Sequence, residues 1–154
     1  MIGGTSWAST QAYYRLINAQ VNTTLEGLHS SKALLSSVDF AEIEECQIKK
    51  AWDKAGAFLT YAAARLEKVS ADFIIVCTNI MQKVAPEICI RVQVPLIHIA
   101  DTTGDILHIV DISKVGLLAT KYTMQGGFYT DKLADAGIDV LISAPEDIKK
   151  SPIP

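Results

Sequence analysis

The stretch Ala71-Asp72-Phe73-Ile74-Ile75-Val76-Cys77-Thr78-Asn79 decides the fold class of this chain. Residues 73–76 are an uninterrupted, mostly β-branched apolar run, which is typical of a parallel strand covered on both faces. The run ends in a thiol, a hydroxyl and an amide, and a helical pattern begins at Ile80. Because ligands of open α/β sheets bind at the carboxyl ends of the strands, this position predicts a chemical role for Cys77. The alternative is that Cys77 packs as a small apolar residue.

Helical and strand patterns alternate along the rest of the chain. The local signals are a Ser9 or Thr10 cap for the first helix, Gly27 after its end, an Asp39 cap for the second, and Gly137 after the last. The predicted helices cover residues 10–25, 41–66 with an interruption near 52–53, 80–91, 101–110 and 122–136. The predicted strands cover residues 33–38, 73–76, 94–99, 115–119 and 138–142. This spacing indicates βαβ units, and therefore an α/β fold with parallel sheets flanked by helices.

Composition narrows the class of protein. The chain has 154 residues, of which 49% are hydrophobic and 20% charged, as expected for a globular protein with a sizeable core. The net charge is only −3 and Lys and Arg do not cluster, so nucleic acid is not an expected partner. No apolar run is long enough to span a bilayer and no signal peptide is recognisable, so no membrane association is expected. Three irregularly spaced cysteines predict reduced thiols and a cytoplasmic setting.

Both ends of the sequence predict a piece of a larger protein. Residues Ile2-Gly3-Gly4 have the character of a strand end followed by a glycine turn, without the body of the strand. The last residues, 151–154, follow a predicted strand without the helix that should cover it. An uncovered parallel strand leaves apolar surface exposed, which is unusual for a complete domain.

Six blocks of sequence, in this order and at this spacing, resemble the aspartate/glutamate racemase family, in its branch of broad-specificity amino-acid racemases. The resemblance covers essentially the whole chain, and it depends on the six blocks together rather than on Cys77-Thr78-Asn79 alone. The blocks are Gly3-Gly4-Thr5-Ser6-Trp7-Ala8-Ser9-Thr10, Gly27-Leu28-His29-Ser30-Ser31-Lys32, Ser37-Val38-Asp39-Phe40-Ala41-Glu42-Ile43-Glu44, Cys77-Thr78-Asn79-Ile80-Met81, Leu96-Ile97-His98-Ile99-Ala100-Asp101 and Val115-Gly116-Leu117-Leu118-Ala119-Thr120.

This resemblance implies a racemase or epimerase that uses no cofactor and is built from two similar α/β lobes, here residues 1–99 and an incomplete 100–154. The implied substrate is a small molecule, an acidic or broadly polar amino acid, and a homodimer is an implied assembly. One cysteine from each lobe faces the α-carbon, and Cys77 matches the first of them. The implied substrate contacts are Thr5, Ser6, Gln47, Thr78 and Asn79, with Thr120 and Thr123 on the facing turn of the second lobe.

The chain departs from the family pattern at the second cysteine, which the family has in a segment beyond position 154. We expect neither spare thiol to replace it, because Cys46 belongs to the same lobe as Cys77 and Cys89 has the pattern of a core position. The family also commonly has threonine and histidine where this chain has Ile80 and Gln82. The activity of this chain is therefore in question. Two alternatives stay open, a non-catalytic remnant that binds an amino acid or small carboxylate, and one-base chemistry such as decarboxylation or hydrolysis.

Other reactive side chains predict ordinary structural roles. The histidines His29, His98 and His108 are isolated, and we interpret them as surface or internally bonded residues rather than metal ligands. Lys32 is either a partner for a substrate side-chain carboxylate or, as we favour, a solvated lysine. No spacing predicts a metal site, a dinucleotide site or a pyridoxal-phosphate lysine.

Overall fold

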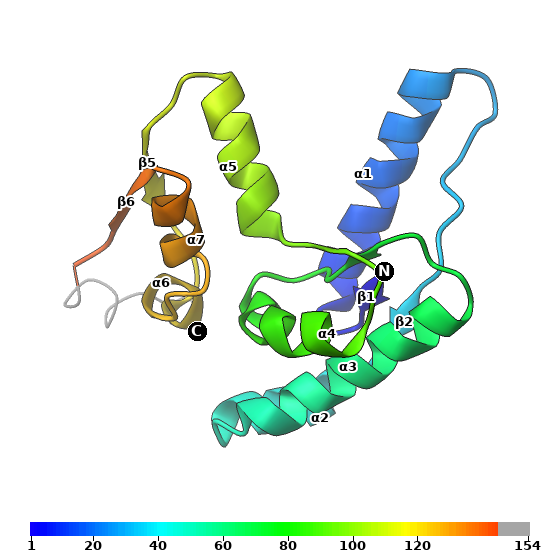
Figure 1. Ribbon diagram of the computed structural model, residues 1–154, viewed down its shortest axis with the longest axis horizontal. Helices are drawn as coiled ribbons and strands as arrows, with labels where there is room; N and C mark the ends of the chain where they lie inside the picture. The colour runs from blue at the N-terminus through cyan, green and yellow to red at the C-terminus, as the bar shows by residue number, and fades with distance from the viewer. Residues whose placement is uncertain (145–154) are drawn as a thin grey trace. The chain divides into compact units, whose positions relative to one another are not determined.

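The computed structural model describes residues 1–144, and the chain forms two compact units, Met1–Leu96 and Ile97–Pro154. Short strands alternate with helices throughout both units (Figure 1). The predicted α/β fold with parallel sheets flanked by helices is thereby confirmed. Among the described residues, no helix is long and apolar enough to cross a membrane.

The first unit is organised around β1, a strand of only two residues. In chain order its elements are β1 (Ile2–Gly3), α1 (Trp7–Leu25), β2 (Ser36–Ser37), α2 (Phe40–Ile48), α3 (Trp52–Lys68), β3 (Ile74–Ile75), the 3₁₀ helix η1 (Ile80–Val84), α4 (Ala85–Arg91) and β4 (Leu96–Ile97). On one side β1 pairs in parallel with β2, with Ile2 opposite Ser36. On its other side Ile2 forms a parallel bridge with Val76, directly after β3. Since β3 also pairs with β4, the strand order is β2-β1-β3-β4.

The core of the first unit is built mainly on α3. Its buried residues Ala55, Leu59, Ala62, Ala63 and Leu66 recur at the spacing of one helical face. Small residues on this face allow close approach of the chain behind it, and complete burial of a leucine such as Leu59 contributes about 2 kcal/mol. The buried cluster is completed by Ile2, Ile43, Cys46, Ile74, Val76, Met81, Val84, Ile88 and Val92.

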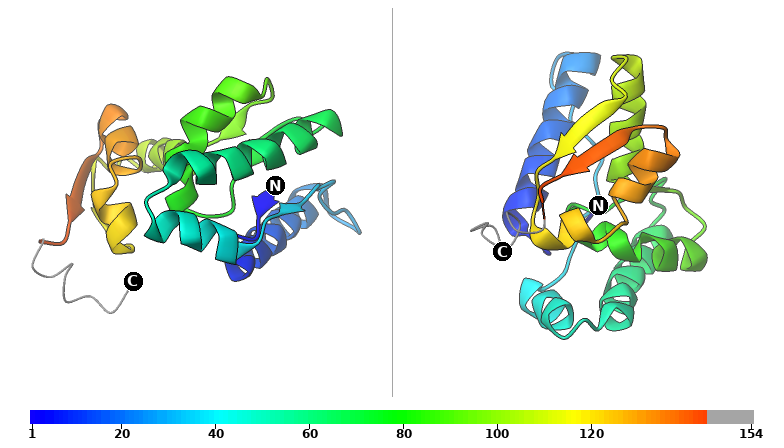
Figure 2. Two further views of the ribbon diagram at one scale, coloured as in Figure 1. Left: turned by 90° about the horizontal axis from the view of Figure 1, so that it is seen from below. Right: turned by 90° about the vertical axis from the view of Figure 1, so that its left-hand side faces the viewer.

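The second unit contains a separate parallel pair. Its elements are α5 (Ile99–Ile109), β5 (Lys114–Leu117), α6 (Lys121–Gln125), α7 (Thr130–Asp135) and β6 (Asp139–Ile142). The strands β5 and β6 run side by side in the same direction, with Val115 opposite Val140 (Figure 2, right). A small cluster of Ala100, Tyr129, Leu133 and Ile138 forms its core.

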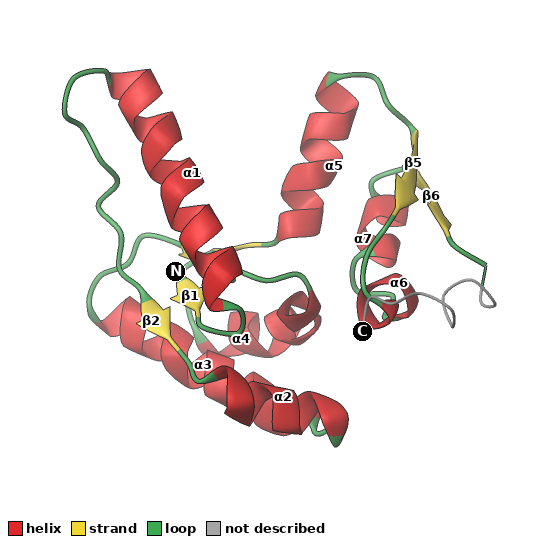
Figure 3. Cartoon of the chain, turned by 180° about the vertical axis from the view of Figure 1, so that it is seen from behind, coloured by secondary structure: helices red, strands yellow, loops and turns green. Residues whose placement is uncertain are grey.

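Several predicted boundaries were wrong, and tertiary context explains them. The first helix begins at Trp7 and is capped by Ser6, whose side chain accepts a hydrogen bond from the Ser9 N–H, so neither Ser9 nor Thr10 is the cap. The predicted helix 122–136 is two short helices, because Gly127 at φ +74° turns the backbone between them. The Asp39 cap and the break before Trp52 were predicted correctly, and Figure 3 shows α2 and α3 as successive helices joined by a short turn.

Candidate active site

Cys77 lies at the carboxyl end of β3, beside β1. Its backbone N–H donates a 2.9 Å hydrogen bond to the carbonyl oxygen of Ile2, and the preceding Val76 forms the bridge to the same residue. The whole of Cys77 is inaccessible to solvent. The backbone around the thiol is therefore fixed by a neighbouring strand, although β3 itself is shorter than predicted and Phe73 is half exposed.

The strand order places Cys77 at a point where the direction of the chain connections reverses. From β1 the chain passes through α1 to β2 on one side, and it later returns to β3 on the other side of β1. In open α/β sheets the crevice outside the carboxyl ends of two such strands is the usual place for a ligand. Thr5 follows β1 and Cys77 follows β3, so both lie at this edge of the sheet.

The turn between β1 and α1 is closely packed. Gly4 has φ +94°, and a Cβ at this position would lie 2.0 Å from the Val38 carbonyl oxygen, so only glycine fits. The Gly4 N–H donates to Thr10 Oγ1 at 3.0 Å, and this hydroxyl donates in turn to the Ser6 carbonyl oxygen at 2.9 Å. The sequence did not predict this role of Thr10; the available signal was a threonine in the first turn of a helix that follows a Gly-Gly turn.

Thr5 Oγ1 is the unusual atom of this turn. It is buried and forms no hydrogen bond. A buried hydroxyl without a partner costs about 1–3 kcal/mol, because its hydration is lost and nothing replaces it. Such an atom in a native structure calls for an explanation. One explanation is a bound group that forms a hydrogen bond with the Thr5 hydroxyl.

The remaining predicted residues gather around the segment that follows Cys77. Thr78 is partly buried and Asn79 is exposed, and both precede η1. Gln47, near the end of α2, donates from Nε2 to Met81 Sδ at 3.3 Å, which ties α2 to η1. The expected continuous α-helix from Ile80 to Arg91 was wrong, because its first part is the 3₁₀ helix η1 and the α-helix starts at Ala85.

Burial controls the acidity of the thiol. Desolvation raises the pKa of Cys77 to about 11, against a smaller opposing effect of the N-terminal ammonium group. No side-chain cation acts on the thiol among the causes of this shift. At neutral pH the resting side chain is therefore a thiol, and it requires a positive charge or a ligand beside it to become a thiolate.

Neither of the other two cysteines lies at the strand edge that carries Cys77. Cys46 is buried in the core of the first unit, on α2. Cys89 was expected to be a core residue, and this was wrong because it is exposed on α4. The helix α4 buries Ala85 and Ile88, whereas Cys89 faces solvent.

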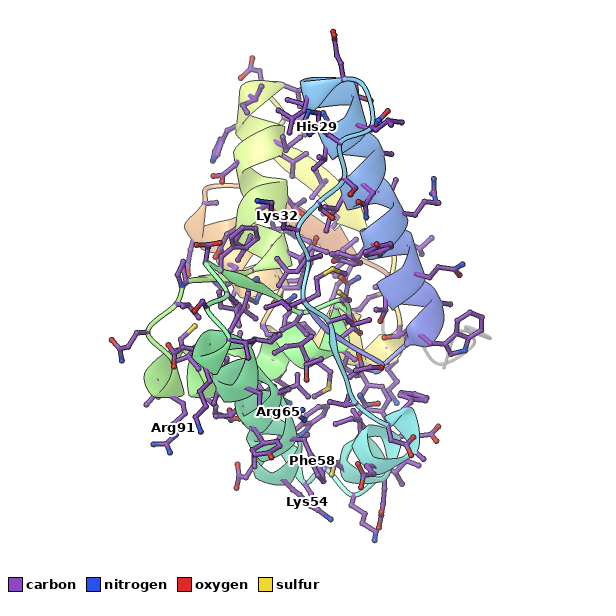
Figure 4. The ribbon with its side chains drawn as sticks, turned by 90° about the vertical axis from the view of Figure 1, so that its right-hand side faces the viewer. His29, Lys32, Lys54, Phe58, Arg65 and Arg91 are labelled. Atoms are coloured by element: carbon purple, nitrogen blue, oxygen red, sulfur yellow. The ribbon has the colours of Figure 1, made fainter. Side chains whose placement is uncertain are left out.

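His98 is bonded internally, and His29 and Lys32 are exposed to solvent. His98 is buried, and its Nδ1 accepts a hydrogen bond from the Ala100 N–H at 3.1 Å, which confirms an internally bonded histidine that caps α5. His29 and Lys32 lie on the exposed connection from α1 to β2 (Figure 4). Lys32 precedes β2, so it belongs to the amino end of the strands, away from Cys77. Within residues 1–144 no three His, Cys, Asp or Glu side chains are grouped to hold a metal ion.

Thr120 and Thr123 meet at the carboxyl end of β5, in the second unit. Thr120 caps α6, and the two hydroxyl oxygens are 3.2 Å apart. The turn is thus ordered by its own hydrogen bonds, and Thr123 is buried.

A parallel α/β protein with a buried cysteine at the switch point of its strands is the class that the fold and site define. Residues 2–153 match the family model for Asp/Glu/hydantoin racemases, and the chain belongs to this family. It is 47% identical to a structure described as a putative Asp/Glu racemase from Yersinia pestis, with a TM-score of 0.92 over 96% of this chain. This chain spans 65% of the length of that structure.

Two further structures share the fold. An aspartate racemase homologue from Pyrococcus horikoshii OT3 is 25% identical, with a TM-score of 0.81 over 97% of this chain and 66% of that one. The aspartate racemase of Picrophilus torridus is 20% identical, with a TM-score of 0.75 over 97% of this chain and 63% of that one.

Proposed function

We propose that this chain carries one half of the site of an amino-acid racemase that needs no cofactor, with Cys77 exchanging the α-proton of the substrate. The observation that carries the proposal is the placement of Cys77 and Thr5 after neighbouring strands at the switch point. Family membership and the likeness to structures described as aspartate racemases support the reaction class.

The chemistry requires a base on one face of the α-carbon and an acid on the other. Cys77 acts on one face as thiolate or thiol. The carbanion that forms carries negative charge, which fixed donors around the α-carboxylate stabilise. In the proposed site these donors are the Thr5, Ser6 and Thr78 hydroxyls, the Gln47 and Asn79 amides, and the backbone N–H groups after Cys77.

The high pKa of Cys77 has two consequences for this reaction. A thiolate of pKa about 11 is a stronger base than an ordinary cysteine, which suits the weakly acidic α-proton. It is also scarce, since at pH 7.5 only about 0.03% of such a thiol is ionised. We infer that the α-ammonium group of the substrate, bound beside the thiol, favours the thiolate.

A complete inversion needs a second acid, and the chain has no other suitable thiol. Cys46 is enclosed in the core of the first unit and Cys89 faces solvent on α4. We therefore expect proton exchange with retention of configuration from these 154 residues. The alternative function is binding of an amino acid or small carboxylate without catalysis, which the protonated resting state of Cys77 favours.

The test is α-proton exchange in D₂O, followed by NMR and by chiral chromatography, with L- and D-aspartate, L- and D-glutamate and a small panel of amino acids. The parent is compared with Cys77→Ser and with Cys89→Ser, the matched control at an exposed cysteine. Exchange that Cys77→Ser abolishes and Cys89→Ser retains supports the proposal. No exchange, together with substrate binding detected by calorimetry, would leave the binding function; exchange that survives Cys77→Ser would refute the role of the thiol.

A further inference from the structure

Gln82 contacts the main chain on both sides of Cys77. Its Nε2 donates to the carbonyl oxygen of Val76 at 3.1 Å and to that of Thr78 at 3.4 Å. The side chain is 1% exposed, so these bonds form away from water. One amide group therefore joins the peptide between Val76 and Cys77 to the peptide between Thr78 and Asn79.

The orientation of this amide follows from the chemistry of its partners. Two carbonyl oxygens accept only, so the NH₂ end of the Gln82 side chain must face them. The opposite atom, Oε1, is then buried without a hydrogen-bond partner. An apolar side chain of similar size would fill the same space without an unpaired acceptor, so packing alone does not account for a glutamine here.

The two hydrogen bonds that Gln82 Nε2 donates are called the clamp below. The clamp complements two backbone hydrogen bonds of the same segment. The Cys77 N–H donates to the Ile2 carbonyl oxygen at 2.9 Å, and the Gln82 N–H donates to the Asn79 carbonyl oxygen at 3.0 Å. The segment 76–79 is thus held by β1 on one side and by η1 on the other. With both carbonyls of the clamp engaged, the thiol and the N–H groups after it keep one arrangement.

We propose that Gln82 is a positioning residue for Cys77, holding the thiol and the adjacent backbone donors in the geometry needed for proton transfer; this rests on the proposed function of Cys77. Gln82 does not touch the substrate and acts through the Val76 and Thr78 carbonyls. The Gln82 amide carries no charge and does not titrate, so it adds no inflection to the pH dependence of the parent's exchange rate.

The first variant is Gln82→Met, which keeps the approximate volume and removes both donors. We expect its kcat for α-proton exchange to fall about tenfold or more, since small misplacements of a reacting group are costly. The KM should stay within about threefold, because substrate contacts are retained. Gln93→Met, the same change at an exposed glutamine, is the matched control and should behave as the parent.

The second variant is Gln82→Glu, nearly identical in shape. Its protonated carboxyl donates a hydrogen bond to one of the carbonyls, whereas the ionised carboxylate repels both. The exchange rate of this variant, relative to the parent, should therefore decline with rising pH and gain an inflection that the parent lacks. A residue needed only for packing would not introduce this inflection. This variant also serves if Gln82→Met does not fold.

A thiol measurement separates this proposal from the proposed function. Alkylation by iodoacetamide is mapped by mass spectrometry, with exposed Cys89 as the internal reference. In Gln82→Met the ratio of Cys77 to Cys89 labelling should rise about fivefold or more, because the segment opens more often. This result supports the clamp even if the parent exchanges no α-protons. A ratio within about twofold of the parent, or a Gln82→Glu profile identical to that of the parent, would overturn it.

Discussion

The buried thiol of Cys77 predicts a specific dependence of stability on pH. Its pKa in the folded protein is about 11, against an ordinary value of 9.0. The folded state therefore binds this proton more tightly than the unfolded state does. The corresponding stabilisation is complete below pH 9 and is lost as the pH rises from 9 towards 11. Replacing Cys77 by alanine removes this dependence.

The magnitude follows from the separation of the two pKa values. In the window between them the free energy of unfolding falls by about 1.4 kcal/mol per pH unit. At pH 10.5 the accumulated loss from this group is about 2 kcal/mol. The Cys77 side chain is inaccessible to solvent, which agrees with desolvation being the main cause of the raised pKa.

The assay is urea unfolding of the parent and of Cys77→Ala at pH 7.5, 8.5, 9.5 and 10.5. Lysine and tyrosine titrations affect both proteins equally, and the cavity left by the substitution costs the same at every pH. The difference in stability between the two proteins should therefore shrink by about 2 kcal/mol from pH 7.5 to pH 10.5. A constant difference would refute the reasoning, since it would mean that the thiol has the same pKa in both states.

Substitutions at four further positions test the fold by their effect on the free energy of unfolding. Leu59→Ala empties a completely buried position and should cost about 2–5 kcal/mol, measured by urea unfolding. Asp39→Ala removes the cap of α2 and should cost about 1 kcal/mol, whereas Asp39→Asn should cost far less. Gly4→Ala places a Cβ against the Val38 carbonyl at positive φ and should cost about 2 kcal/mol or more, seen as a lower Tm. Lys132→Ala breaks a half-exposed ion pair with Asp101 and should change stability by less than about 1 kcal/mol, a change that high salt should remove.

Local signals predicted the elements well where a few neighbouring residues decide the structure. Asp39 caps α2 because its own side chain accepts the hydrogen bond from the Ala41 N–H. The first helix ends at Leu25, two residues before Gly27, because a glycine is a local signal for the end of a helix. The choice of Ser6 over Ser9 as the first cap depended on where β1 stops, which the local pattern does not contain.

Burial of single side chains was harder to predict. Cys89 lies in an apolar stretch, but the direction in which α4 packs leaves it outside the core. The orphan hydroxyl of Thr5 and the clamp of Gln82 likewise depend on atoms brought in by the fold. Sequence alone places these residues near Cys77 in the chain or at a strand end, and the hydrogen bonds decide what each can do.

By itself, the sequence determined the alternation of strands and helices, the α/β class and the position of Cys77 at the end of a strand. These features depend on periodicity and on capping residues within a turn or two. Only the tertiary structure decided the order β2-β1-β3, which brings the end of β1 beside Cys77. That order depends on hydrogen bonds between residues far apart in the chain, such as Ile2 and Cys77, whose pairing no local propensity encodes.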